Sequence, residues 1–143
     1  MRNFNLNFDI ETKILELKDS ILNKVKNCYS PYSKFRVVAV LITKNSYYFG
    51  VNIENRSFGL TNCAERSAIF SAISNGDKDF EAIIIYSPDY DKPIPPCGAC
   101  RQVISEFSSN LPIIMLSKDF SFDIKSIDML LPLDSLENLK EKG

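Results

Sequence analysis

The chain has 143 residues, of which 45% are hydrophobic and 24% charged, and its formal net charge is −1. This composition excludes disordered and fibrous proteins, and the scattering of lysine and arginine among acidic residues argues against binding to a nucleic acid. Residues 1–10 lack the apolar core of a secretory signal and no apolar stretch approaches the ~20 residues of a membrane span, so we expect a cytoplasmic protein with no membrane partner.

The first half of the chain predicts a helix, a β-hairpin and a second helix. Apolar residues recur at near-helical spacing over Glu11–Cys28, which is typical of an amphipathic helix. The runs Phe35–Ile42 and Tyr47–Ile53 are rich in β-branched and apolar residues, and a polar turn joins them as a hairpin. Asn62–Ser74 is the second predicted helix, because Asn75-Gly76 stops it.

The second half predicts two strands around a helix, followed by a third strand and a short helix. The apolar runs Ala82–Tyr86 and Pro112–Leu116 are suited to buried strands, and Gly98–Phe107 between them is predicted to be helical. The turn after the second of these strands is too short for a crossover, so a strand at Phe120–Ile124 should run antiparallel to its predecessor. A short helix near Ser126–Leu130 follows.

This order of elements predicts an α/β fold class with a mixed sheet of about five strands, covered by helices on its faces. No linker or internal repeat interrupts the sequence, and its length is within the usual range of one compact domain. We therefore expect a single domain over residues 1–143.

The sequence contains no histidine, the most frequent general base near neutral pH. A serine or cysteine nucleophile that depends on a histidine partner is therefore excluded. Acid–base chemistry must use a carboxylate, lysine, tyrosine, cysteine or metal-bound water, and a metal site must be built from thiolates or carboxylates. The candidate catalytic residues are correspondingly few.

Three of the four cysteines lie where predicted helices begin, in segments 61–66 and 95–102. Cys97 and Cys100 are three residues apart, so on a helix they project from one face and can bind one ion, with Cys63 as the third ligand. The positive end of a helix dipole favours thiolate over thiol at both helix starts. Three thiolates leave one tetrahedral position open, and a catalytic zinc site needs that position for water.

Two charged residues that follow Cys63 complete the predicted site. Glu65 is the only carboxylate in the two cysteine segments, which makes it the candidate proton shuttle. Arg66 lies three residues after Cys63 on the same helical face. Its guanidinium is therefore expected to donate hydrogen bonds to the ligand sulfurs and to offset the surplus negative charge of three thiolates.

Cys63-Ala64-Glu65 and Pro96–Cys100 resemble the signature of the zinc-dependent cytidine deaminases. The resemblance continues through Ser30–Phe35, Asn52–Asn55 and Leu130–Pro132, and so covers most of the chain. It implies a three-layer α-β-α sandwich, one Zn2+ per subunit, and the small three-cysteine form that assembles as a homotetramer. The implied reaction is hydrolytic deamination of cytidine and 2′-deoxycytidine in pyrimidine salvage, in which a zinc-bound hydroxide attacks C4 and Glu65 moves the protons.

The same resemblance implies a substrate site. Asn52 and Glu54 would hold the ribose hydroxyl groups, and the backbone at Ala64 would help to read the pyrimidine edge. Phe35 would pack against the base, and Phe58 stands where the family often places an aromatic residue that reaches a neighbouring subunit's site.

The chain departs from the family pattern in two places. Val37-Val38-Ala39 stands where Val-Gly-Ala is usual, which implies altered local packing. Leu133-Asp134-Ser135 follows the Leu-Leu-Pro motif where an aromatic residue is common, so the aromatic cover that another subunit's C-terminus normally lends is not implied for this chain.

The residues leave alternatives open. Glu65 could complete a capping box with Asn62, and Cys97 and Cys100 could form a redox pair. Cys28 could close a four-cysteine structural zinc site in a protein that is not an enzyme, although it is most simply a small apolar residue near a helix end. The substrate could also be a nucleoside antibiotic of the blasticidin type or a base within a polynucleotide, and the charge argues against the polynucleotide.

Overall fold

The computed structural model describes residues 4–139, and its helices and strands cover most of that range. In chain order they are α1 (Ile10–Val25), β1 (Val38–Thr43), β2 (Tyr47–Val51), the 3-10 helix η1 (Phe58–Leu60), α2 (Ala64–Ser74), β3 (Phe80–Tyr86), α3 (Gly98–Phe107), β4 (Pro112–Leu116), β5 (Phe122–Ser126) and α4 (Ile127–Leu130). In this part of the chain, no helix is both long enough and apolar enough to cross a bilayer.

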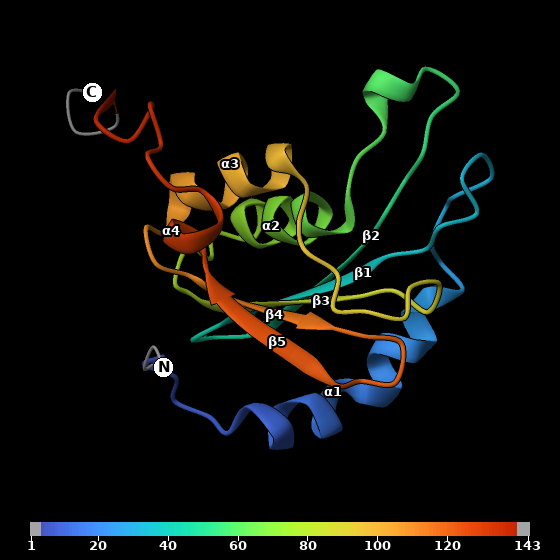
Figure 1. Ribbon diagram of the computed structural model, residues 1–143, viewed down its shortest axis with the longest axis horizontal. Coiled ribbons are helices and arrows are strands. Elements are labelled where there is room, and N and C mark those ends of the chain that lie inside the picture. The colour runs from blue at the N-terminus through green and yellow to red at the C-terminus, as the bar shows by residue number, and fades with distance from the viewer. Residues whose placement is uncertain (1–3, 140–143) are drawn as a thin grey trace.

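The strands form one five-stranded sheet in the order β2-β1-β3-β4-β5 (Figure 1). Only β3 and β4 pair in parallel, and α3 is the crossover between them, as a parallel pair requires. The other neighbours pair antiparallel, including β4 with β5. The predicted α/β class and mixed five-stranded sheet are therefore confirmed, as is the antiparallel direction of the last strand.

Alternate residues of the strands supply the cores on the two faces of the sheet. In β1, Ala39 and Leu41 pack with buried residues of α2, α3 and α4, whereas Val38 and Val40 pack with α1. The same alternation holds in β3 and β4, because successive side chains of a strand point to opposite faces. The result is three layers, with α1 alone on one face and the other helices on the opposite face (Figure 1).

The ends of the first helix follow local signals. The carboxylate of Asp9 accepts a hydrogen bond from the backbone N–H of Thr12 at 3.0 Å and caps the N-terminus of α1. The helix ends at Val25 instead of the predicted Cys28, where the Cys28 N–H bonds to the carbonyl of Val25 in a turn. Ile14, Leu17 and Ile21 form the buried stripe of this amphipathic helix, as its periodicity predicts.

Two predicted strands begin too early. β1 starts at Val38 instead of Phe35, because the N–H groups of residues 35–37 all bond to side-chain oxygens in place of a neighbouring strand. β5 starts at Phe122 instead of Phe120, because Phe120 lies in a turn with φ at 69°. The other predicted boundaries agree to within two residues, η1 is missed by the sequence analysis, and the ends of the predicted domain, residues 1–3 and 140–143, lie outside the described part.

Gly50 brings β2 and α2 into direct contact. A Cβ atom at this position would lie 2.2 Å from the carbonyl oxygen of Ala64 and 2.5 Å from the backbone nitrogen of Ala68. Neither backbone atom can yield without moving the helix. The absence of a side chain at Gly50 therefore fixes how closely the first turn of α2 lies on the sheet.

Candidate metal centre and substrate wall

Two helix starts on the same face of the sheet carry the candidate metal ligands. Cys63 is the N-cap residue of α2 and Cys97 is that of α3, both with extended backbone. Cys100 follows in the first turn of α3 and is completely buried. Because the positive ends of both helix dipoles meet here, the site favours negative charge.

The three cysteine sulfurs form a compact cluster. All three Sγ atoms lie within 4.8 Å of one another, with Cys63 and Cys97 at 3.6 Å and Cys97 and Cys100 at 3.4 Å. A tetrahedral zinc ion separates its sulfur ligands by about 3.8 Å, because each Zn–S bond is about 2.3 Å long. The donor set and its spacing therefore fit Zn2+, and no other such group of cysteine and acidic side chains occurs within residues 4–139.

The fourth cysteine lies outside this cluster. The Sγ atom of Cys28 is 3.3 Å from the backbone carbonyl of Val37, to which it donates a hydrogen bond. Burial raises the pKa of this thiol, which keeps it protonated. The four-cysteine structural site considered from the sequence is therefore not formed.

The charges around the sulfurs support metal binding. Hydrogen bonds from Cys100 and Arg66 lower the pKa of Cys63 to about 5 against the opposing effect of burial. The contact with Cys63 in turn raises the pKa of Cys100. The guanidinium Nη2 of Arg66 lies 3.3 Å from Cys63 Sγ, so the hydrogen bond expected from the sequence is present. A fixed positive charge next to the sulfurs offsets the negative charge of a three-thiolate centre.

Glu65 is a buried carboxyl group beside the cysteine cluster. Its residue is only 4% exposed, and burial raises its pKa to about 7, with a further rise from the negative charge of Cys63. A carboxyl group that titrates near neutrality can both accept and donate a proton. The N-cap residue of α2 is Cys63 and no side chain caps this helix, so the capping box of Glu65 with Asn62 is not formed.

The residues predicted to bind ribose lie next to the start of α2. The antiparallel bridge between Ile53 and Asn62 brings this segment to the residue that precedes Cys63. The side chain of Asn52 is buried, donates to the carbonyl of Phe35 at 2.7 Å and accepts from the N–H of Val37 at 3.0 Å. Asn52 therefore fixes backbone as well as offering one remaining N–H to a ligand.

Glu54 also contacts the preceding loop. Its Oε1 accepts from the backbone N–H groups of Tyr32 at 3.0 Å and Ser33 at 3.2 Å, and its Oε2 accepts from the Ser33 hydroxyl. These contacts, with the Ser33 hydroxyl first among them, lower the pKa of Glu54. The carboxylate is thus ionised and retains acceptor capacity on Oε2.

The remaining predicted substrate residues occupy three different environments. Phe35 is partly buried and packs against the core cluster that includes Ala64, so it lies on the same face of the sheet as the cysteines. Ala64 is completely buried at the first position of α2. Phe58 is 76% exposed and contacts the ring of Tyr32 at 5.9 Å between centroids, so it lies outside the core.

Sequence analysis misses two residues that contact the segment around Phe35. Asp89 bonds to the backbone and side chain of Arg36, and Tyr90 contacts the ring of Phe35. Both lie in the loop between β3 and α3, far along the chain from the residues that they touch. Because these contacts join residues far apart in the sequence, no local sequence pattern predicts them.

The three-layer fold and the cysteine cluster define the class of the molecule, a zinc-binding α/β protein. Residues 12–115 match the family model described as the cytidine and deoxycytidylate deaminase zinc-binding region. The chain is also 40% identical over 126 residues to a cytidine deaminase from Sporosarcina psychrophila, a match that covers 87% of this chain and 89% of that protein. The chain therefore belongs to the cytidine deaminase family, with a three-cysteine zinc site.

Two further comparisons define the similarity. The crystal structure of a cytidine deaminase from Burkholderia pseudomallei superposes with a TM-score of 0.77 at 37% identity, over 83% of this chain and 96% of that chain. A blasticidin-S deaminase from Bacillus cereus is 33% identical over 139 residues, which cover 92% of this chain and 98% of that protein. The predicted family, cytidine deaminase-like fold and zinc cofactor are thus confirmed.

Proposed function

We propose that the protein catalyses the hydrolytic deamination of cytidine and 2′-deoxycytidine to uridine and 2′-deoxyuridine. The observation that carries this proposal is the buried Glu65 carboxyl group beside three cysteine sulfurs at two helix starts. The family membership and the identity to cytidine deaminases over most of the chain support the same reaction.

Cys63, Cys97 and Cys100 would hold the zinc ion, which when bound supplies Lewis-acid activation of water. Glu65 moves the protons: its carboxylate takes one from the attacking water, delivers it to N3 of the pyrimidine, and assists the departure of ammonia from C4. The pKa of about 7 suits this carboxyl group to both directions of transfer. Arg66 would keep the sulfur cluster electrostatically balanced through its bond to Cys63.

The substrate residues favour a free nucleoside. The unused N–H of Asn52 and the remaining acceptor capacity of Glu54 match the donor and acceptor character of ribose hydroxyl groups. The backbone at Ala64 would read the pyrimidine edge, and Phe35 would pack against the base. The ionised Glu54 would repel a phosphate placed beside it, which supports nucleosides over nucleotides as substrates.

The decisive experiment incubates purified protein with cytidine, 2′-deoxycytidine, cytosine and cytidine monophosphate and follows the ultraviolet change to the uracil product. The wild-type protein should convert the two nucleosides. Glu65→Gln should retain its zinc but lose about 10²- to 10⁴-fold in turnover, because a positioned acid–base group contributes that much. A fully active Glu65→Gln variant, or a wild-type protein that converts neither nucleoside, would contradict the proposal.

A second candidate substrate is a nucleoside antibiotic of the blasticidin type. The 33% identity to the Bacillus cereus blasticidin-S deaminase over nearly the whole chain favours it. Adding blasticidin S to the substrate panel separates the two candidates, since the preferred substrate is the one with the higher kcat/KM.

We also propose that the chain is one domain that assembles as a homotetramer in the cytoplasm. Both hydrophobic cores share the same sheet, which supports one domain. Phe58 and Leu60 on η1 are more than two-thirds exposed, which suits a contact with a neighbouring subunit, and four free thiols suit a reducing compartment. Light scattering during gel filtration tests the assembly, and a monomeric mass would contradict it.

A further inference from the structure

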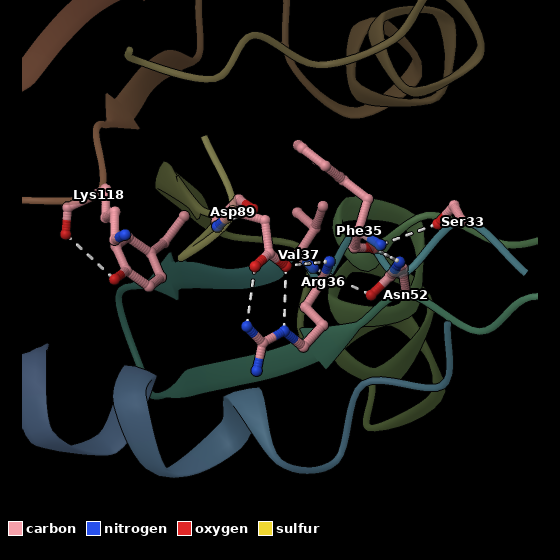
Figure 2. A network of polar contacts seen from close by, with 9 residues as sticks. Ser33, Phe35, Arg36, Val37, Asn52, Asp89 and Lys118 are labelled. Atoms are coloured by element: carbon pink, nitrogen blue, oxygen red, sulfur yellow. Dashed lines mark hydrogen bonds and ion pairs between the residues drawn. The ribbon is translucent and has the colours of Figure 1, made fainter. Parts of the chain in front are cut away.

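The segment that carries Phe35, residues 33–37, is held mainly by side chains, although the Val37 carbonyl also accepts the backbone N–H of Asn52 at 3.2 Å. We call it the Phe35 segment. Its start is marked by Lys34, which has a positive φ of 61°. The N–H of Phe35 bonds to Ser33 Oγ at 3.0 Å, and its carbonyl accepts from Asn52. Figure 2 shows these side chains converging on the segment, just before the start of β1.

Asp89 lies in the β3–α3 loop, which leads to Cys97, and accepts three hydrogen bonds from Arg36 of the Phe35 segment. Its Oδ2 accepts from the Arg36 backbone N–H at 2.9 Å and from Arg36 Nε at 3.0 Å. Its Oδ1 accepts from Arg36 Nη2 at 2.8 Å, which completes a bidentate ion pair in which the two groups face each other (Figure 2). Asp89 stands eight residues before Cys97, so this pair joins the Phe35 segment to the β3–α3 loop.

An aromatic contact lies beside this ion pair, between Phe35, the neighbour of Arg36, and Tyr90, the neighbour of Asp89. The rings of Phe35 and Tyr90 meet edge to face with centroids 6.3 Å apart. Tyr90 is itself fixed, because its carbonyl accepts from the Lys118 N–H at 3.1 Å. Neighbouring residues of one segment thus contact neighbouring residues of the other, once by charge and once by ring packing.

We propose that Arg36 and Asp89 are positioning residues for the substrate base, which act by holding the Phe35 ring against the nucleoside site. This inference rests on the proposed function. Phe35 packs against the core cluster of which Ala64 is a member. Its hydrogen bonds and ring contact go to Ser33, Asn52 and Tyr90 and not to the cysteines, so a displaced Phe35 segment should change the wall of the site before the metal cluster. Loss of the pair should therefore weaken substrate binding and leave the chemical step intact.

The geometry of the pair suits a positioning role. The side chains are 44% and 25% exposed, so water screens the charge attraction between them. The fork geometry and the additional backbone N–H instead give the contact directional specificity. Arg36 lowers the pKa of Asp89, so the pair is ionised at the neutral pH of the assay.

The test measures KM and kcat for cytidine, the inhibition constant of the product uridine, and zinc content, in wild type, Asp89→Ala, Asp89→Asn and Arg36→Ala. We expect Asp89→Ala to raise KM and the uridine constant roughly threefold to tenfold, while kcat stays within about twofold. Asp89→Asn should have the smaller effect, because its amide oxygen still accepts from the Arg36 N–H. The matched control is Glu16→Ala, which breaks the 3.3 Å pair with Lys13 on the opposite face and should change neither constant.

A double-mutant cycle with Phe35→Ala makes the mechanism falsifiable. Once the ring is absent, Asp89→Ala should raise KM no further, because the two substitutions remove the same contact with substrate. An unchanged KM in both Asp89 variants, an equal rise without the Phe35 ring, or a fall in kcat with loss of zinc would each overturn the inference. If Asp89→Ala does not fold, the comparison of Asp89→Asn with Arg36→Ala decides by the same criteria. A wild-type protein that leaves cytidine unchanged would refute the proposed function itself and this inference with it.

Discussion

The cysteine cluster and the Phe35 segment lie on the same face of the sheet but are held in place in different ways. The cluster uses helix starts: Cys63 and Cys97 occupy the N-cap positions of α2 and α3, and Cys100 follows in the first turn of α3. The Phe35 segment lacks regular structure and depends on side chains up to 53 residues away. Local backbone geometry therefore positions the cysteine cluster, whereas long-range polar contacts position the Phe35 segment.

The largest effect should come from the cluster. Cys97→Ser replaces a thiolate ligand with a hydroxyl group, which is a far weaker ligand for zinc at neutral pH. We expect zinc to be lost and turnover to fall by at least about 10³-fold, since water activation depends on the ion. Atomic absorption on the purified variant, alongside the deaminase assay, measures both quantities.

Cys28→Ser is the matched control for that substitution. Cys28 bonds to the Val37 carbonyl and lies outside the cluster, so this variant should keep its zinc and its activity. Loss of zinc from Cys28→Ser would show that the ligand set differs from the one described above.

A smaller effect is expected at Glu54, which bonds to the start of the Phe35 segment. Glu54→Ala removes the acceptor of three hydrogen bonds from Tyr32 and Ser33 together with the ionised group proposed to hold the ribose. Hydrogen bonds to charged groups contribute about 1.5–3 kcal/mol, so KM for cytidine should rise by about 10- to 100-fold. Steady-state kinetics measure it, with Glu11→Ala on α1 as the control. If Glu54→Ala lowered kcat and left KM unchanged, the contacts of the Phe35 segment would act on the chemical step, and the proposed difference from the cysteine cluster would be wrong.

Arg66→Gln tests the charge balance of the cluster. The guanidinium lies 3.3 Å from Cys63 Sγ, and groups that bond to metal ligands typically contribute about 10-fold or more to metal affinity or activity. We expect turnover to fall by about 10-fold while the fold is retained. The exposed Arg56→Gln serves as the control. An Arg66→Gln variant with wild-type rate and zinc content would mean that this charge does not matter.

The smallest effect concerns a polar junction that has no part in the chemistry. Asp77 is buried and accepts hydrogen bonds from Thr43 Oγ1 at 2.6 Å, Tyr48 Oη at 3.1 Å and Asn45 Nδ2 at 3.4 Å, which join the β1–β2 turn to the end of α2. These contacts, the Thr43 hydroxyl first, lower the pKa of Asp77 below its usual 3.8. Asp77→Asn should reduce the free energy of unfolding at pH 7 by about 1 kcal/mol without changing KM.

The pH dependence of this difference has a definite sign. Because the folded-state pKa of Asp77 is depressed, its ionised form stabilises the fold above the unfolded-state pKa, and that contribution is lost as the pH falls through the folded-state value. Urea unfolding of wild type and Asp77→Asn should therefore show a gap that is constant near neutrality and closes below about pH 4. A gap that widens on acidification would exclude this account.

The sequence was sufficient for the fold class, the five strands and the cysteine cluster, because these depend on periodicity and on short spacings. The helix Gly98–Phe107 and the strand Pro112–Leu116 have the predicted bounds, and the bond from Arg66 to Cys63 follows from their separation of three residues. Helix geometry converts such spacings directly into distances.

The contacts that hold the Phe35 segment could not be predicted from the sequence in the same way. The family resemblance implies a ribose-binding role for Asn52 and Glu54, and their residue types alone would suit solvated residues at a strand end, yet both bond to the loop before β1. The apolar run from Phe35 to Ile42 predicted a strand throughout, since propensity carries no information about Asp89, which binds the backbone at residue 36. The contact of Asp89 requires the tertiary fold before it can be seen.

Gly50 has a consequence for anyone who would alter this enzyme. It has no side chain that could contact a substrate, yet it lies directly against the backbone carbonyl of Ala64, the residue whose backbone is proposed to read the pyrimidine edge. Even alanine would force the Ala64 carbonyl back by roughly 1 Å, and displacements of that size away from the chemistry can cost about 100-fold in rate. Libraries aimed at new nucleoside analogues should keep this glycine invariant and place their diversity elsewhere.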